Sequence, residues 1–412
     1  MMKRFWYGLL LAALLSACSS NTPPPVVSTT TVPVSVTAAP TNTSVPTPIP
    51  PTATTLPTAT AVASPTATVE PKDYGPDNFP TNVDPLTGQV VGNPDLLNRR
   101  PIAVKINLYG RKTYRPPWGI SFADIVYDFY HNDGYSRLHA IFYGKDAETV
   151  GAVRSGRLLD NDLVQMYKSI FVYGGADQRI NRVFLNSNYS DRLMLEGGGP
   201  HVCPPTPETP MCRFEPNGLD LLLSGTREVT QYAKAKGFDS QKPDLNGMTF
   251  QQEAPANGKP GVQLFTRYSL DAYNRWDYDE ASGQYLRFQD AQEDTGQGET
   301  FEPLTDRLNN QQVSAANVVV ILAATENTLK ATTAEIIDIH LSGSGQAYAF
   351  RDGQVYDVRW NRPTADSVLF LTDPDGNPFP FKQGTTWFQV IGQTSKVEDQ
   401  GKGVWRFTFS EP

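Results

Sequence analysis

The amino-acid sequence is poor in cysteine and histidine, since its 412 residues include only three cysteines and four histidines. It also lacks the GxSxG, HExxH, P-loop, GxGxxG and CxxC motifs, so the common serine hydrolases, zinc proteases, nucleotide-binding proteins and thiol oxidoreductases are not indicated. We therefore assign no catalytic, metal-binding or cofactor-binding residue. A binding role is favoured over an enzymatic one.

Charge is absent from a long N-terminal stretch. Residues 19–69 contain no Lys, Arg, Asp or Glu and no aromatic residue, and they consist almost wholly of Pro, Thr, Ser, Ala and Val. Such a segment cannot bury enough apolar surface to offset the entropy of ordering. We expect residues 18–80 to form a disordered tether, in which the roughly fifty uncharged residues alone could reach on the order of 150 Å, at about 3.1 Å per residue in polyproline II. A linker without any length requirement is the alternative.

The amino end has the parts of a secretory signal. Lys3 and Arg4 precede an apolar run from Phe5 to Leu15, which is too short for a permanent membrane helix. The next residues, Leu15-Ser16-Ala17-Cys18, resemble the lipobox of bacterial lipoprotein precursors, which implies cleavage before Cys18 and its acylation. A plain secretory signal with an incidental cysteine is the alternative. The sequence predicts a signal peptide over residues 1–17 and a chain lipid-anchored at Cys18 on the extracytoplasmic face of the cell membrane.

The remaining body is acidic. Without Lys3 and Arg4, 33 basic residues face 43 acidic ones, which gives a formal charge of −10. This balance argues against nucleic acid and anionic lipid headgroups as partners, so the bilayer is contacted through the acyl anchor alone. No second apolar run of about 18 residues follows.

Two cysteines remain once Cys18 is assigned to the lipid. Cys203 and Cys212 close a short Pro-rich segment, and an exported compartment can be oxidising, so a disulfide between them is favoured. Two free thiols are the alternative. A metal site is the least favoured reading, because His201 is the only obvious further ligand nearby.

Hydrophobic patterning indicates an α+β fold with two domains. In the first, residues 81–243, alternating strands at Ile125–His131 and Tyr135–Tyr143 flank an Asn-Asp-Gly turn and predict an antiparallel hairpin. Helices are expected over residues 155–168 and 226–236, which gives mixed α/β layers. In the second, residues 244–412, strand patterns dominate and predict a β-rich domain.

Several motifs carry a resemblance to a known family. The N-terminal ones are Pro85-Leu-Thr-Gly88, Arg100-Pro-Ile-Ala-Val, Ala123-Asp-Ile-Val-Tyr127 and Val150-Gly-Ala-Val-Arg-Ser-Gly-Arg157. The C-terminal ones are Trp276-Asp-Tyr-Asp, Tyr285-Leu-Arg-Phe, Gly345-Gln-Ala-Tyr-Ala-Phe-Arg-Asp-Gly353 and Gly384-Thr-Thr-Trp-Phe-Gln-Val390. In this order they resemble the YerB-like lipoproteins, with paired N- and C-terminal domains of unknown function. The resemblance implies a membrane-tethered bacterial protein of two α+β domains and no established activity.

Three positions depart from the family pattern. The chain has Ile106-Asn107-Leu108 where the family commonly has Ile-Asp-Asn, and Asp128 where Glu is usual. The family's Pro-His-Asn is reduced to Pro216-Asn217. If that Asp and His are catalytic in relatives, this chain is impaired.

The best candidate site is the segment from Val153 to Arg157, at a predicted strand-to-helix junction. Helix amino ends present unpaired N–H groups and partial positive charge. Together with Ser155, two arginines there would make a receptor for a carboxylate or phosphate. We expect the adjoining hairpin to line the same cleft with further residues. The predicted ligand-binding set is Arg154, Ser155, Arg157, Arg137, Asp124, Tyr127 and Asp128. In the alternative reading, Arg154 or Arg157 pairs with Asp124 or Asp128 and only fixes the junction.

The sequence thus predicts a non-enzymatic envelope lipoprotein that binds a cell-wall component or an envelope protein. A cell-wall-active hydrolase or transferase, with Asp124 and Asp128 as acid and base, is the alternative. A scaffold for an envelope complex is a third reading.

Overall fold

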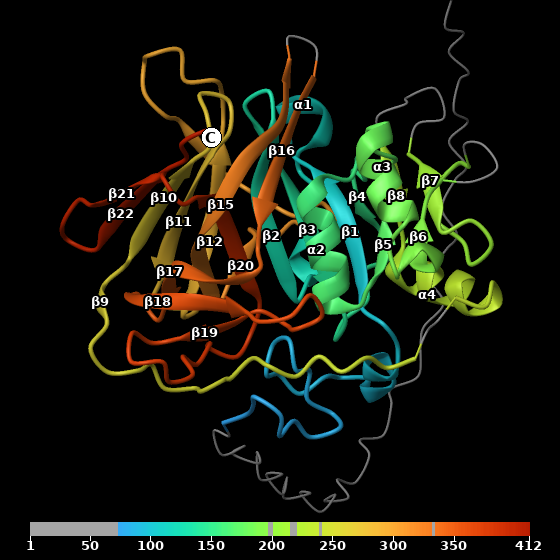
Figure 1. Ribbon diagram of the computed structural model, residues 1–412, viewed down its shortest axis with the longest axis horizontal. Helices are drawn as coiled ribbons and strands as arrows, with labels where there is room; N and C mark the ends of the chain where they lie inside the picture. Colours follow the sequence, from blue (N-terminus) through green and yellow to red (C-terminus); the bar gives the residue numbers. More distant parts are fainter. Residues whose placement is uncertain (1–72, 197–200, 215–220, 239–240, 332–333) are drawn as a thin grey trace, which may run out of the picture. The chain divides into compact units, whose positions relative to one another are not determined.

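The computed structural model describes residues 73–196, 201–214, 221–238, 241–331 and 334–412 (Figure 1). The signal peptide, Cys18, the tether up to residue 72 and Pro216-Asn217 lie outside these ranges. Tyr74 is buried, and its backbone N–H and C=O bond to Phe250. The packed body therefore begins before residue 81, earlier than predicted, because the Tyr74 ring stacks on Phe79 and Phe79 packs on Phe250. In the described ranges no helix is both long and apolar enough to cross a bilayer.

The described part is β-rich with few helices. The α-helices are α1 (Arg111–Tyr114), α2 (Leu158–Tyr167), α3 (Gln178–Leu185) and α4 (Thr226–Ala235), with 3₁₀ turns η1 (Pro94–Asn98), η2 (Ile120–Phe122) and η3 (Ser190–Arg192). The first strands are β1 (Ile102–Asn107), β2 (Ile125–Asn132), β3 (Tyr135–Phe142), β4 (Val150–Gly151), β5 (Ile170–Val172), β6 (Leu193–Met194), β7 (Met211–Arg213) and β8 (Leu222–Ser224).

The C-terminal half is built almost entirely of strands. They are β9 (Lys259–Pro260), β10 (Gln263–Arg267), β11 (Tyr273–Asp279), β12 (Gln284–Asp290), β13 (Phe301–Pro303), β14 (Ser314–Ala315), β15 (Asn317–Ala331), β16 (Ala334–His340), β17 (Gly343–Arg351), β18 (Gln354–Arg362), β19 (Phe370–Thr372), β20 (Thr386–Gly392), β21 (Lys396–Asp399) and β22 (Val404–Thr408).

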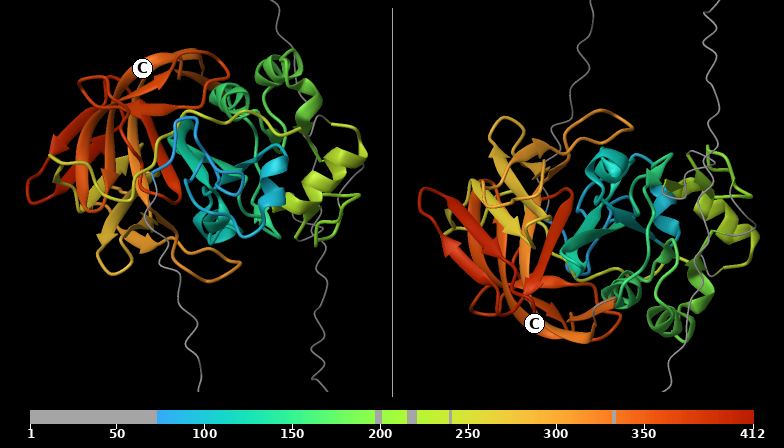
Figure 2. Two further views of the ribbon diagram at one scale, coloured as in Figure 1. Left: turned by 90° about the horizontal axis from the view of Figure 1, so that it is seen from below. Right: turned by 90° about the horizontal axis from the view of Figure 1, so that it is seen from above.

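One large sheet runs through both halves of the body. Its order is β19-β18-β17-β15-β20-β2-β3-β1-β5-β6, with β16 paired to β15 and β9 to β18. Strand β20 is parallel to both neighbours, so Thr386 faces Ile125 of β2 on one side and Asn317 of β15 on the other. Figure 2 shows the two halves side by side along this sheet. The main sheet therefore contains strands from both sides of the domain boundary predicted at residues 243/244.

The hairpin of β2 and β3 forms where the alternation predicts it. Its turn residues Asp133 and Gly134 have φ values of 51° and 82°, which suit the two central positions of a type I′ turn. The pairing register shifts between Tyr130 and Asn132, which places an extra residue in β2. This bulge decides which side chains of β2 point to each face of the sheet.

A second sheet packs on the part of the main sheet that contains β2 and β20. Its order is β13-β12-β11-β10-β22-β21, with β14 paired to β12. The contact is aromatic and charged: Trp276 of β11 lies edge-on to Trp387 of β20, with ring centroids 5.1 Å apart. Arg287 of β12 reaches Asp128 of β2 at 2.7 Å.

Helix α2 positions the candidate site. It packs against β16 and α3 (Figure 1), and its last residue, Tyr167, shares a 2.7 Å hydroxyl–hydroxyl hydrogen bond with Tyr127 of β2. The sequence did not predict α3, whose eight residues offer only two buried positions, Ile180 and Phe184. Beside this layer, β4, β8 and β7 form a small sheet, and a disulfide joins Cys203 to Cys212, whose Cα atoms are 4.9 Å apart.

Candidate functional site

Four of the seven residues predicted for the site meet at the amino end of α2. Arg157 is the N-cap residue, and its backbone N–H donates to Asp160 Oδ2 at 2.6 Å. Arg137 of β3 donates from Nη1 to the Ser155 carbonyl oxygen at 3.0 Å, and Arg157 Nη1 approaches the same oxygen at 3.3 Å. The Arg154 guanidinium donates to the Tyr114 hydroxyl and lies 4.9 Å from the centre of that ring. We call Arg137, Arg154 and Arg157 the arginine cluster.

The guanidinium groups of the arginine cluster lie close enough to act on one another's charge. Burial lowers the pKa of Arg137 well below its ordinary value, and the charges of Arg157 and Arg154 lower it further. Its Nε atom is buried and has no hydrogen-bond partner among the described residues. Each of the three side chains nevertheless keeps part of its surface exposed. The cluster thus combines buried and solvent-accessible guanidinium surface at one helix end.

A buried triad lies beneath the arginine cluster. Asp160 Oδ1 accepts a hydrogen bond from Lys105 Nζ at 3.0 Å and lies 2.8 Å from His139 Nδ1, and all three side chains are fully buried. Burial lowers the pKa of Lys105 to about 7, against the attraction of Asp160 and with help from Arg137 and Arg157. Burial alone would raise the pKa of Asp160, but Lys105 and His139 bring it below the ordinary value. Asp160 therefore stays anionic and is the carboxylate that supports the cluster from below.

The other three predicted residues lie elsewhere, so this part of the prediction is wrong. Asp124 Oδ2 accepts the backbone N–H groups of Tyr143 and Gly144 at 2.5 and 2.9 Å. Asp128 bonds to Arg287, and Tyr127 to Tyr167. The alternative reading, in which Asp124 or Asp128 pairs with the junction arginines, is also not seen.

The bulge in β2 explains the placement of Asp128. A regular two-residue hairpin would set Asp128 opposite His139, on the face of the arginine cluster. With the bulge, Tyr127 faces His139 and Asp128 faces Leu138, on the other side of the sheet. A shift of one residue exchanges the faces of a strand, so Asp128 meets the second sheet and Arg287 instead.

Asp124 and Asp128 do not form a general acid–base pair. Four residues along an extended strand separate them by roughly 13 Å, more than the roughly 5–10 Å that glycosidase carboxylates need. Both side chains are also fully buried. Nothing in this geometry supports the hydrolase alternative.

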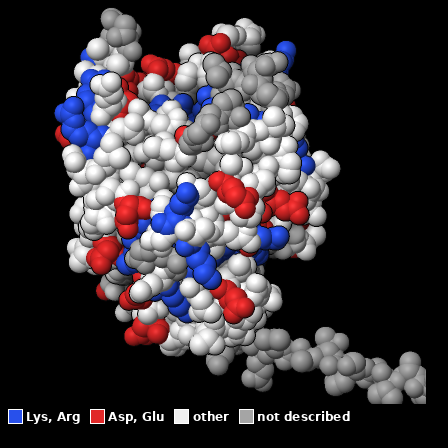
Figure 3. Space-filling view, turned by 90° about the vertical axis from the view of Figure 1, so that its right-hand side faces the viewer, with Lys and Arg blue, Asp and Glu red and all other residues white. Residues whose placement is uncertain are grey.

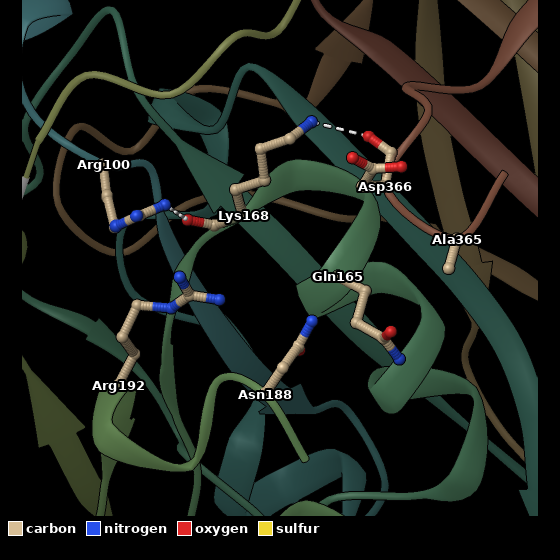
Figure 4. A pocket seen from close by; sticks show the side chains of 7 residues that line it. All are labelled: Arg100, Gln165, Lys168, Asn188, Arg192, Ala365 and Asp366. Atoms are coloured by element: carbon tan, nitrogen blue, oxygen red, sulfur yellow. Dashed lines mark hydrogen bonds between the residues drawn. The ribbon is translucent and has the colours of Figure 1, made fainter. Parts of the chain in front are cut away.

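Two further groupings were not found from the sequence. A pocket of about 400 Å³ at the carboxyl end of α2 is lined by three cationic side chains (Figure 4). Glu326, Asp338 and His340, on β15 and β16, bring ligand-type atoms within 4.8 Å of one another. Both assemblies join residues that are distant in sequence or paired across strands, so no local motif marks them.

On the face with α3 and α4, acidic and basic side chains are interspersed (Figure 3).

Comparison with known proteins identifies the family of this chain. The N-terminal domain of the family described as protein of unknown function (DUF3048) matches residues 86–201, and its C-terminal domain matches residues 264–388. The chain belongs to the YerB-like DUF3048 family. The protein named "Putative lipoprotein YerB" of Bacillus subtilis (strain 168) is 25% identical over 343 residues, which cover 81% of this chain and 93% of the relative.

A solved structure resembles this DUF3048 protein in fold. The crystal structure of the YerB protein from Bacillus subtilis has a TM-score of 0.58 and 24% identity, and the match covers 75% of this chain and 96% of that one. The resemblance inferred from the motifs, with paired domains of unknown function, is confirmed. None of these matches names a ligand or a reaction.

Proposed function

We propose that this DUF3048 protein is a lipid-anchored binding protein of the extracytoplasmic face of the membrane. In this proposal the arginine cluster receives a carboxylate or phosphate of a cell-envelope ligand. Two features support the location: Cys18 follows an apolar run in a lipobox-like context, and the relative from Bacillus subtilis bears the name of a lipoprotein.

The observation that carries the proposed ligand class is the gathering of three guanidinium groups at the amino end of α2, where burial and the charges of Arg157 and Arg154 lower the pKa of Arg137. Arg137 donates to one carbonyl oxygen and leaves its buried Nε without a partner in the described part of the chain. An anion bound at the exposed part of these guanidinium groups would offset the repulsion between their charges. Arginine also offers paired N–H groups that match carboxylate and phosphate oxygens.

The location is tested by replacing the acylated residue. Because two or three acyl chains hold a protein durably on a bilayer, Cys18→Ser is expected to move the chain from the membrane fraction to the soluble fraction after cell lysis. Immunoblotting of both fractions measures this. A Cys18→Ser chain that is processed normally and stays with the membrane would overturn the anchor assignment.

The ligand class is tested by co-sedimentation of the full-length chain, in detergent, with purified cell-wall sacculi. Arg137→Gln with Arg154→Gln is expected to weaken binding at least about tenfold, since a hydrogen bond to a charged group contributes about 1.5–3 kcal/mol. Arg179→Gln with Arg227→Gln removes the same charge from exposed positions and serves as the matched control.

The two readings of the arginine cluster separate in this experiment. Weakened binding with an unchanged melting temperature supports ligand binding. Undiminished binding by the cluster variant contradicts the proposal, and a lowered melting temperature beside it assigns the arginines to the fold instead.

A further inference from the structure

We propose that Glu326, Asp338 and His340 form a binding site for a divalent transition-metal ion, with Zn²⁺ as the expected occupant. Glu326 lies on β15, and Asp338 and His340 lie on β16. Their ligand-type atoms all lie within 4.8 Å of one another. We call these three residues the β15–β16 cluster. None of them belongs to the arginine cluster, so each site can be tested without the other.

Strand pairing places the three side chains on one face of the hairpin. Glu326 is paired directly with Asp338. His340 follows Asp338 by two residues, so its side chain returns to the same face. The pairing is regular from Ala324 to Asn327, and the register shifts only beyond this stretch. The ladder of β15 and β16 therefore sets the arrangement of the three groups.

Two carboxylates face each other across this pairing. Like charges directly opposite on neighbouring strands are destabilising. Burial raises the pKa of Asp338, and His340 opposes this rise. The charges of Asp162, on α2, and of Glu326 raise it further, although Asp162 is itself paired with Arg362 at 3.2 Å. A divalent cation between Glu326 and Asp338 would be attracted to both carboxylates and would offset their repulsion.

His340 distinguishes the β15–β16 cluster from an ordinary acidic patch. Its Nε2 atom lies 3.4 Å from Glu326 Oε1, farther than the roughly 2.7–3.2 Å of a good hydrogen bond. Ligand atoms at about 2.0–2.2 Å from a tetrahedral zinc ion lie roughly 3.4 Å apart. The imidazole and the Glu326 carboxylate are thus already spaced as two zinc ligands. Glu326 and His340 are 66% and 45% exposed, so rotation of their side chains can bring both to Asp338.

The donor set selects the class of metal. One imidazole nitrogen and two carboxylate oxygens suit zinc and its neighbours among the transition metals. Calcium prefers about six to eight oxygen ligands, and magnesium requires near-octahedral oxygen coordination. Three protein ligands that include a nitrogen match neither ion well. A tetrahedral zinc ion held by the cluster would keep its fourth position for water.

A metal ion here would join two strands where they leave the main sheet. Residues 317–323 of β15 pair with β20, and the first five of them also pair with β17. From Ala324 to Ala331 the described partner of β15 is β16, which packs against α2 and β2 (Figure 1). A two-stranded ribbon is only marginally stable by itself. An ion between Glu326 and β16 would therefore stiffen this arm at its base.

The test is titration calorimetry with Zn²⁺ on the full-length chain in detergent, purified without a histidine tag and stripped of metal with EDTA. Wild type is expected to bind Zn²⁺, and to bind Ca²⁺ and Mg²⁺ at least about tenfold more weakly. Glu326→Gln, Asp338→Asn and His340→Gln each remove one ligand at nearly constant size. Each should weaken zinc binding at least about tenfold.

Thermal melting separates metal binding from a purely structural role. An ion that binds only the folded chain raises its melting temperature, so Zn²⁺ should stabilise wild type more than any of the three variants. In EDTA, Asp338→Asn should melt no earlier than wild type, because it relieves the repulsion from Glu326. If His340 and Glu326 form only an ion pair, Glu326→Gln and His340→Gln should instead melt earlier in EDTA and bind zinc as wild type does, which would contradict the proposal.

Two matched controls lie outside the cluster. Glu253→Gln removes a carboxylate at an exposed position, and His201→Gln removes a partly exposed imidazole; both should bind Zn²⁺ as wild type does. Zinc bound equally well by all three cluster variants would assign the ion to other groups and overturn the proposal. The absence of zinc binding to wild type at submillimolar concentration, or calcium binding as tight as that of zinc, would overturn it as well.

Discussion

Replacing Arg287 with methionine is expected to lower the free energy of unfolding by about 3–5 kcal/mol, the usual cost of removing one partner from a buried ion pair. Arg287 is fully buried, donates from Nη2 to Asp128 Oδ2 at 2.7 Å, and lies over the Trp387 ring at 4.3 Å. Burial raises the pKa of Asp128, and Arg287 is the main group that opposes this. Without Arg287 the carboxylate stays buried and uncompensated between the two sheets. Equilibrium urea unfolding followed by tryptophan fluorescence measures the loss.

Two comparisons make the Arg287 result specific. Arg275 pairs with Asp277 in the same sheet at 2.8 Å, but both are partly exposed, so Arg275→Met should cost less than about 1 kcal/mol. Adding Asp128→Leu to Arg287→Met should recover much of the stability, because no lone charge remains. Equal losses for Arg287→Met and Arg275→Met would show that the buried pair does not hold the sheets together.

Replacing Asp160 with asparagine is expected to cost about 3–5 kcal/mol near neutral pH, again because a buried partner is left alone. Asp160 compensates Lys105 and contacts His139, both fully buried. The amide keeps the size of the side chain but loses the charge. Asp177→Asn is the matched control, since Asp177 caps α3 at an exposed position where asparagine caps equally well.

The cost of Asp160→Asn should grow as the pH falls from about 7 toward 5. The pKa of Lys105 is lowered to about 7 in the folded protein, below its unfolded value, so wild-type stability rises with pH between about 7 and 10 and levels off below about 7. Without Asp160 the folded pKa of Lys105 falls further, and stability continues to drop below pH 7. Burial lowers the pKa of His139 and Asp160 raises it, so Asp160→Asn should lower the pKa of His139 further as well.

Urea unfolding of both variants at pH 5.5, 7 and 9 measures this dependence. A cost that is the same at all three values, or that is largest at pH 9, would contradict the assignment of Asp160 as the charge partner of Lys105.

Local features of the fold could be predicted from the sequence. The alternation around Asn132-Asp133-Gly134 predicts the β2–β3 hairpin, and the structure has it, because turn chemistry and side-chain period are both local signals. The helix of residues 226–236 is likewise present as α4. The insertion of β20 between β2 and β15 could not be predicted, since parallel pairing leaves no signal in neighbouring residues.

The candidate site was predicted in part for the same reason. Arg154, Ser155 and Arg157 are close in sequence, and Arg137 is brought to them by the hairpin. The position of Asp128 depends on one bulged residue, which no turn motif announces. The pocket at the carboxyl end of α2 joins Arg100, Lys168 and Asp366, which only the complete fold brings together.

The shared main sheet can be completed only late in folding, because β20 lies far along the chain from β2. The Thr385 hydroxyl bonds to the Ala123 carbonyl oxygen across 262 positions of sequence, and β20 lies alongside β2. Until β20 has been synthesised, β2 presents an open edge of unpaired backbone groups, the kind of edge on which strands of other molecules add. Neither of the two family domains therefore completes the main sheet without the other.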